Sequence, residues 1–99
     1  MNDIRYEIYN TEELMKEFTS GKNEDIYKTS SFVRNKVSSF IQDLSLHINY
    51  KKISEYPKLF TLIHNNIYDK YTKTTFNICA QYKIENDKIV IIKAKFSIL

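Results

Sequence analysis

The last quarter of the chain, residues 76–98, carries the pattern that most restricts the fold. In two runs separated by a short polar stretch, every second side chain is apolar. This period of two is that of a β-strand with one buried face. Because both apolar sets must face the same core, we expect a β-hairpin in which Phe76 opposes Ile98 and Ile84 opposes Val90. That register requires an odd-numbered loop, roughly three or five residues long.

Helical spacing dominates the first half of the chain. After a short strand at residues 3–9, the segment from Asn10 resembles a capping box and opens a helix that ends near Gly21, the only glycine. A second cap at Asn23 precedes apolar side chains that recur at helical spacing. We expect one helix over residues 24–47, about 36 Å long at about 1.5 Å per residue, which exceeds the usual width of such a small domain.

This long helix predicts a contact with a second molecule. Phe32 lies off the apolar stripe, on the side that carries Lys36, so an apolar side chain faces away from the core. Because a twofold symmetric pairing uses the same patch on both subunits, we expect a homodimer with Phe32 and Lys36 in its interface. The last strand of the hairpin offers a second, edge-to-edge route to the dimer.

Two segments between the helix and the hairpin leave alternatives open. Residues 48–56 fit a short edge strand and a loop equally well. Residues 57–66 favour a short helix that ends at residues 64–66. The competing interpretation is a pair of strands, 59–63 and 67–73, joined by a turn.

These elements together predict a single α+β domain over residues 1–99. A single antiparallel sheet of about three to five strands, with the C-terminal β-hairpin in it, packs against two or three helices. The helix over residues 24–47 covers the apolar face of this sheet. The opposite face carries the outward side chains of the hairpin, which are Cys79, Gln81, Lys83, Lys93 and Lys95.

The sequence contains no catalytic or cofactor signature. The only soft ligands, His47, His64 and Cys79, match no metal spacing, so we expect no metal site. One glycine cannot build a phosphate loop or a dinucleotide fingerprint, so we expect no cofactor. A cysteine–histidine nucleophile pair stays open as an alternative. The sequence therefore favours a non-enzymatic protein.

Charge is distributed unevenly along the chain. Residues 1–25 hold seven acids and three bases, a net −4, whereas residues 26–99 hold five acids and twelve bases, a net +7. Such asymmetry suits an acidic partner, nucleic acid included, as well as a solvated surface. The sequence has no long apolar run and no signal peptide, which predicts an intracellular protein without a membrane partner.

Lysine and tyrosine are interleaved through one part of the basic half, where they offer cations for phosphates and rings for stacking. The candidate binding residues are Tyr50, Lys51, Lys52, Tyr56, Lys58, Tyr68, Lys70, Tyr71 and Lys73. Arginine, the usual reader of base edges, occurs only at positions 5 and 34. A surface rich in tyrosine is equally typical of protein–protein interfaces.

Residues 57–96 resemble the C-terminal half of RelE/ParE-type toxins. The likeness runs through Ile67-Tyr68-Asp69-Lys70, Gln81-Tyr82-Lys83-Ile84 and residues 89–96. The order of a strand, helices and an antiparallel sheet is shared as well. This resemblance implies a ribonuclease that acts on messenger RNA, with Lys70, Lys73 and Lys83 where the toxins typically carry arginine.

The chain is also similar to small proteins of crenarchaeal filamentous and rod-shaped viruses, such as the Acidianus filamentous viruses. Its last third, from Asn66-Ile67-Tyr68 to Phe96, is similar in pattern to their type I-D anti-CRISPR proteins. This resemblance implies a small α+β protein, often dimeric, that acts by binding in the cytoplasm of the infected cell. We expect a non-enzymatic viral or mobile-element protein that binds a host or viral macromolecule. The alternatives are a RelE-like toxin ribonuclease and a nucleic-acid-binding module.

Overall fold

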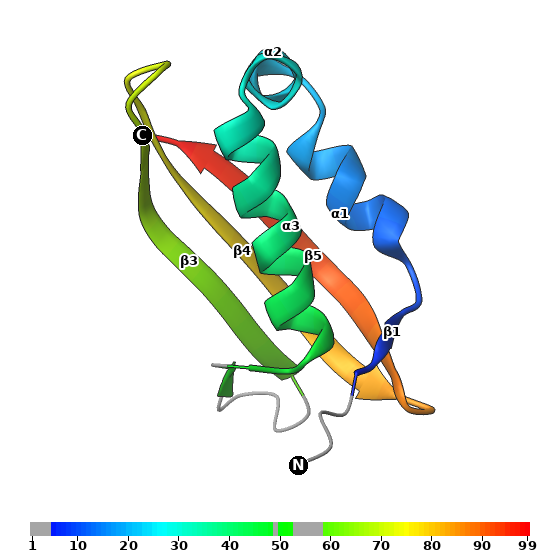
Figure 1. Cartoon of the computed structure of the whole chain (residues 1–99). Helices are drawn as coiled ribbons and strands as arrows, with labels where there is room; N and C mark the ends of the chain where they lie inside the picture. The colour runs from blue at the N-terminus through cyan, green and yellow to red at the C-terminus, as the bar shows by residue number, and fades with distance from the viewer. Residues whose placement is uncertain (1–4, 49, 53–58) are drawn as a thin grey trace.

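The computed structural model describes residues 5–48, 50–52 and 59–99. Within these ranges the chain folds into three helices and one five-stranded sheet, which confirms the predicted α+β class (Figure 1). The helices are α1 (Thr11–Phe18), α2 (Lys22–Thr29) and α3 (Ser31–Ser45). The strands are β1 (Glu7–Ile8), β2 (Lys51–Lys52), β3 (Leu59–Asp69), β4 (Thr74–Glu85) and β5 (Lys88–Ile98).

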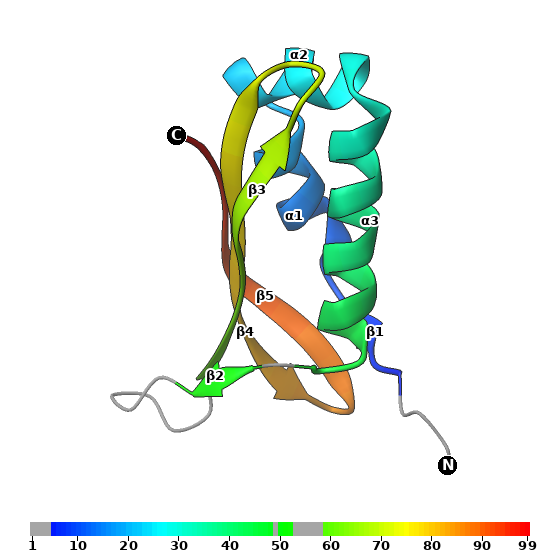
Figure 2. The same cartoon turned by 60° about the vertical axis from the view of Figure 1, so that its left-hand side comes forward.

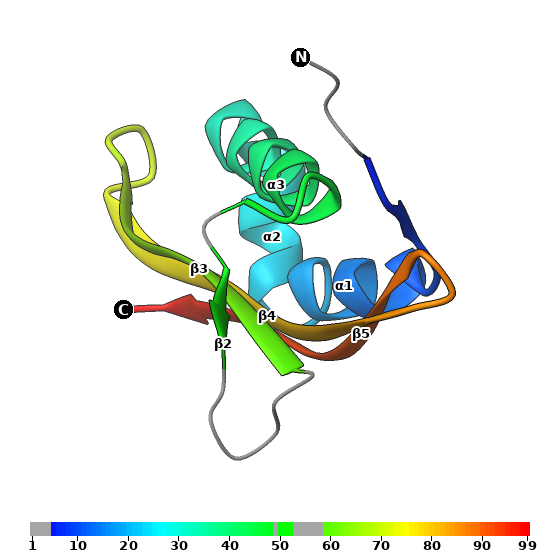
Figure 3. The ribbon, with the colours of Figure 1, turned by 90° about the horizontal axis from the view of Figure 1, so that it is seen from below.

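The helices cover one face of the sheet, and the other face is open to solvent. Its strand order is β1-β5-β4-β3-β2, with antiparallel pairs throughout except for β1, which runs parallel to β5. Figures 2 and 3 show all three helices on the same side of the sheet. The opposite side is an open face, and the directly paired residues Asn77 and Ser97, Cys79 and Lys95, and Gln81 and Lys93 lie on it.

The core lies between the helices and strand β4, whose alternation is as predicted. Every second side chain of β4 from Phe76 to Tyr82 is buried, and the residues between them are only partly covered. The helices contribute one side chain per turn to the same core. The buried helical residues are Leu14, Phe18, Val33, Val37, Phe40 and Leu44. The sheet is therefore amphipathic, with its apolar side chains directed toward the helices.

The C-terminal hairpin confirms one part of the predicted register and corrects the other. Phe76 opposes Ile98, as the alternation predicts. At the other end, however, Ile84 opposes Ile89 and not Val90, so the predicted register is wrong there. The expected odd-numbered loop is wrong for the same reason, because this pairing leaves only two residues in the turn.

A β-bulge in β5 explains why the register differs between the two ends of this hairpin. Ile92 is an extra residue in β5, because Ile91 and Lys93 pair with consecutive residues of β4. The bulge changes the phase of β5, so Ile92 is half exposed while Ile91 is buried. The turn residues Asn86 and Asp87 both have positive φ, 54° and 60°, as the tight hairpin turn of type I′ requires.

The single long helix predicted over residues 24–47 is wrong, because the chain breaks at Ser30. Ser30 has extended backbone angles, and its side chain accepts a hydrogen bond from Val33 N at 3.2 Å, which makes it the N-cap of α3. Helix α3 is then about 22 Å long, shorter than the strands beneath it. Phe32 packs against the core and under the Lys36 ammonium, at 5.3 Å. The protrusion that was expected of a longer helix is therefore absent.

The helix favoured at residues 57–66 is also wrong, since the described part of that segment is strand. Strand β3 runs without interruption through residues 64–66, so the competing interpretation of two strands joined by a turn is wrong as well. Asn65 and Asn66 form a bulge, in which Asn66 adopts φ of 56°. Its backbone N–H donates to Asn77 Oδ1 at 2.8 Å, so the bulge is tied to β4. The edge-strand alternative for residues 48–56 is realised at β2.

Two asparagines that were expected to cap helices bind β5 instead. Asn10 makes no side-chain cap; its amide pairs with Ile91, accepting from N at 2.8 Å and donating to O at 2.9 Å. Asn23 donates to the carbonyl oxygens of Glu17 and Phe96, at 3.1 and 3.3 Å. Asn10 is the N-cap residue of α1 by position, as expected, but its side chain does not cap the helix, and Asn23 lies within α2. Both side chains bind the nearby sheet edge, which offers backbone groups that need partners.

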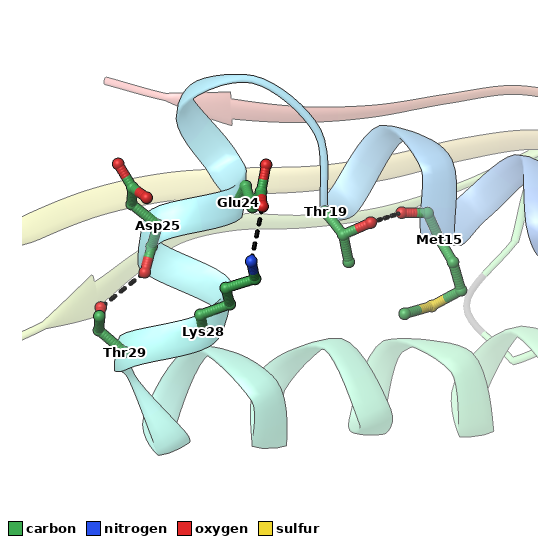
Figure 4. Close-up of polar contacts among 6 residues, drawn as sticks. All are labelled: Met15, Thr19, Glu24, Asp25, Lys28 and Thr29. Carbon is green, nitrogen blue, oxygen red and sulfur yellow. Dashed lines mark hydrogen bonds and ion pairs between the residues drawn. The ribbon is translucent and has the colours of Figure 1, made fainter.

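The ends of α1 and α2 are closed by threonine. Thr19 and Thr29 each donate their hydroxyl to the carbonyl four residues earlier, of Met15 and Asp25 (Figure 4). Gly21, which lies between the two helices, has φ of 59° and ψ of −133°, so it does not form the left-handed helical stop that was expected. It is the N-cap residue of α2, and its positive φ favours glycine.

Candidate functional site

The predicted lysine and tyrosine set does not form one surface in a single copy of the chain. Tyr50, Lys51 and Lys52 lie at β2, which pairs with the beginning of β3. The second group, Tyr68, Lys70, Tyr71 and Lys73, lies at the opposite end of β3, where the chain turns into β4 (Figure 2). At about 3.3 Å per residue, the strand separates the two groups by about 25 Å. Tyr56 and Lys58 lie outside the described residues.

The lysines implied by the toxin resemblance are separated in the same way. Lys70 and Lys73 lie in the turn between β3 and β4, whereas Lys83 lies near the far end of β4. Lys83 is also engaged in an ion pair with Glu85, at 2.7 Å. The three side chains therefore do not converge on one point.

A second group of residues does converge, on the middle of the open face. A shallow depression of about 250 Å³ crosses β3, β4 and β5 there. Its lining residues are Thr61, Ile63, Cys79, Gln81, Lys93, Ala94 and Lys95. Lys93 and Lys95 lie on the same side of β5, about 7 Å apart along the strand. Their ammonium groups belong to a surface that spans three strands.

The electrostatics of this depression are cationic. Three lysine–carboxylate ion pairs form among the described residues, and none of them includes Lys93 or Lys95. Near the hairpin turn, Glu85 and Glu7 pair with Lys83 and Lys88 at 2.7 and 3.8 Å. Glu17 of α1 lines a hollow together with Lys93, and its carboxylate accepts a hydrogen bond from Phe96 N at 3.4 Å. The two central lysines thus keep their charge available for an anionic partner.

The open face excludes the cysteine–histidine pair that the sequence left open. Cys79 lies on the open face, where it pairs with Ile63 of β3. The next residue of β3, His64, points to the helical side and contacts Phe40 and Asp43. His47 also lies on the helical side, where it contacts Tyr82. Burial raises the pKa of the Cys79 thiol, although Lys95 and Lys93 lower it. The thiol is therefore protonated at neutral pH and is a poor nucleophile.

His47 closes the C-terminal end of α3 within an aromatic cluster. Its φ is 56°, and its ring stacks on Tyr50 with centroids 4.4 Å apart. Its Nδ1 lies 2.6 Å from the buried hydroxyl of Tyr82, which donates when this nitrogen is unprotonated. Burial lowers the pKa of His47 and raises that of Tyr82, so both side chains prefer their neutral forms.

The pH dependence of stability should report this burial of His47. Its lowered pKa means that the unfolded state binds a proton first, so the free energy of unfolding is highest above about pH 6.5 and decreases as pH falls below it. Urea unfolding between neutral and mildly acidic pH measures this slope. His47→Asn, which tolerates the positive φ, should flatten it, whereas Tyr82→Phe should retain it. Equal slopes for wild type and His47→Asn would contradict this assignment.

Lys93 and Lys95 are the site residues that sequence reasoning missed. The alternation in β5 placed them correctly on the open face, but the search for binding residues followed lysines interleaved with tyrosines along the chain. The available signal was the spacing of two lysines on one side of one strand. This spacing becomes informative only when the structure shows that the neighbouring strands place no carboxylate beside the two lysines.

No three metal-ligating side chains gather anywhere in the described ranges. Within the same ranges, no helix is long and apolar enough to cross a membrane. Comparison of the chain with protein-family models, with curated proteins and with solved structures gave no significant match.

Proposed function

We propose that this chain is a non-enzymatic binding protein that binds single-stranded nucleic acid on the open face of its sheet. The observation that carries this proposal is the depression across β3, β4 and β5, in which Lys93 and Lys95 form no ion pair with a described carboxylate. Cations along one strand suit the backbone of a nucleic acid, which carries one charge per nucleotide.

The chemistry of this face favours a single strand over a duplex. Tyr68 is 55% exposed and lies on the same face, where it offers a ring for base stacking. The cations come from a strand, and no helix carries them into a groove as duplex-reading motifs do. The absence of arginine from the depression predicts binding with little sequence preference.

Nucleic acid is favoured here over a protein partner for a compositional reason. Lysine is depleted in the cores of protein interfaces, because its ammonium is costly to desolvate. In the depression, Lys93 and Lys95 are the charged lining residues, although most of the exposed lining is apolar. The resemblance to small crenarchaeal viral proteins supports a binding role, and on that resemblance we propose the cytoplasm of the infected cell as its location.

The proposal is tested by fluorescence anisotropy with labelled single-stranded RNA and DNA oligonucleotides across a salt series. Wild type should bind both, with affinity that decreases as salt rises. Lys93→Gln combined with Lys95→Gln should weaken binding by roughly tenfold and reduce the salt slope by about 1.4, since each phosphate contact on a single strand contributes about 0.7.

A matched control removes the same charge from the helical layer. Lys22 and Lys28 lie on α2, on the other side of the sheet, and Lys28 already pairs with Glu24 at 2.7 Å (Figure 4). Lys22→Gln combined with Lys28→Gln should leave affinity within about twofold. Equal losses in the two double variants would show that only net charge matters, and no binding by wild type at low salt would refute the proposal.

A further inference from the structure

The two edges of the sheet are treated differently by the rest of the chain. The β5 edge is closed, because β1 pairs with it at Lys88 and Ile89 and the amide of Asn10 pairs with the next exposed backbone position. Further along, Phe96 N donates to the Glu17 carboxylate at 3.4 Å, and its carbonyl accepts from Asn23. Side chains thus satisfy backbone groups of β5 that would otherwise attract another strand.

Among the residues that the structure describes, a strand covers the β3 edge only at its beginning. Strand β2 pairs with Phe60 and Thr61, and among the described residues no strand pairs with the outer side of residues 62–69. Residues 62–68 contain no charged side chain and no proline, the usual guards of an exposed edge. Ile63 and Tyr68, both on the open face, are 44% and 55% exposed. This edge therefore retains the features that strand pairing uses.

We propose that a second copy of the chain pairs with this edge, with β3 antiparallel to β3 of the partner about a twofold axis between Asn65 and Asn66. The bulge at these two residues shifts the phase of β3, so Ile63 and Tyr68 lie on the open face and His64 and Ile67 on the helical face. A two-fold at the bulge then pairs open-face residues with open-face residues. Ile63 meets Tyr68 of the partner subunit, and His64 meets Ile67 of the partner subunit.

The bulge does not obstruct this pairing. Its extra backbone donor, Asn66 N, is directed into the sheet, where it is bound by Asn77 Oδ1 at 2.8 Å. The side chains nearest the axis are amides, which both donate and accept, so Asn65 can pair with Asn66 of the partner subunit. The edge of β3 is thus complementary to a second copy of β3, whereas an unrelated peptide would lack the matching amides.

The dimer would bring together residues that one copy keeps apart. Antiparallel pairing places the turn after β3 of one copy next to β2 of the other. Tyr50, Lys51 and Lys52 then lie beside the partner subunit's Tyr68, Lys70, Tyr71 and Lys73, and both open faces lie on the same side. This composite surface would extend the proposed nucleic-acid site, whereas the dimer itself does not rest on that function.

This edge replaces the helical surface as the route to a homodimer. Helix α3 does not extend beyond the sheet, and Phe32 packs against the core, so the two features that pointed to a helical interface are absent from the described structure. The last strand, the other predicted route, lies at the closed edge.

The test is light scattering on the full chain at micromolar concentration and physiological salt, where charge repulsion is screened over about 8 Å. Wild type should show twice the monomer mass of 11.8 kDa. Ile63→Lys should shift the mass to that of the monomer while circular dichroism shows unchanged secondary structure. The matched control is Ile92→Lys, an equally exposed isoleucine on the closed edge, which should remain dimeric.

Two results would overturn the proposal, a monomeric wild type and a dimer that survives Ile63→Lys. In the second case, loss of the dimer in Phe32→Asp would place the interface on the helical surface instead. If Ile63→Lys unfolds the chain, Tyr68→Lys tests the same edge at a more exposed position. Because mass is measured without nucleic acid, failure of the dimer is distinguishable from failure of the proposed function.

Discussion

Asp69→Ala is expected to lower the free energy of unfolding by about 3–5 kcal/mol. Asp69 is fully buried, and its carboxylate accepts hydrogen bonds from Ser30 Oγ at 2.7 Å, Thr72 Oγ1 at 2.9 Å and Tyr71 N at 3.0 Å. Alanine would leave these donors without their acceptor. The loss should be large because Asp69 joins the end of β3 to the N-cap of α3, and urea denaturation measures it.

The same carboxylate should give a distinct acid dependence. Burial by itself raises the pKa of Asp69, but the hydrogen bonds from Ser30, Tyr71 and Thr72 outweigh it and hold the pKa below its usual value. Its contribution to stability is thus complete above about pH 4 and is lost as pH falls through the folded-state pKa. Asp69→Asn should lose this acid dependence, whereas the exposed Asp25→Asn should keep it. A loss below about 1 kcal/mol for Asp69→Ala would contradict the assigned role.

Phe40→Ala is expected to cost about 3–5 kcal/mol as well, by leaving a cavity where α1, α3 and β3 meet. The ring of Phe40 is fully buried and packs edge-on against Phe18, at 5.9 Å, and against His64, at 5.0 Å. Removal of the ring also takes away a packing contact of His64, the residue that donates a hydrogen bond to Asp43. Thermal or urea unfolding followed by circular dichroism measures the effect.

A phenylalanine on the same helix provides the control for Phe40. Phe32 lies two turns earlier and is only partly buried, so Phe32→Ala should cost about 1 kcal/mol. Phe40→Leu, which keeps most of the volume, should recover much of the loss. Similar costs for Phe32→Ala and Phe40→Ala would mean that the sheet and helices do not pack around Phe40 as described.

The parts of the fold that follow a regular period could be predicted from the sequence, and the interruptions could not. Strand β4 and the buried side of α3 were predictable because a single period persists over each of them. The bulge at Ile92 was not, because a phase change within an apolar run looks like a change of loop length. The break at Ser30 was hidden because serine is compatible with a helix interior, and its capping role depends on Asp69, 39 residues later.

The candidate site shows a similar limit. The open face could be predicted from alternation, since that pattern decides which side of β5 Lys93 and Lys95 occupy. The grouping of residues 50–73 into one surface could not, because a strand of 11 residues carries neighbours in sequence far apart in space. Residues 57–66 were assigned to a helix, and a helix would have halved that separation.

The parallel pairing of β1 with β5 has a consequence for how the chain folds. Strands β3, β4 and β5 follow one another and can form early, since only short loops must close. The contacts of β1 and Asn10 with β5 join residues 81 positions apart, so the entropy cost of closing that loop is larger. The β5 edge thus closes late, and until then both sides of the nascent sheet are open to other chains, the stage at which a β-rich intermediate aggregates.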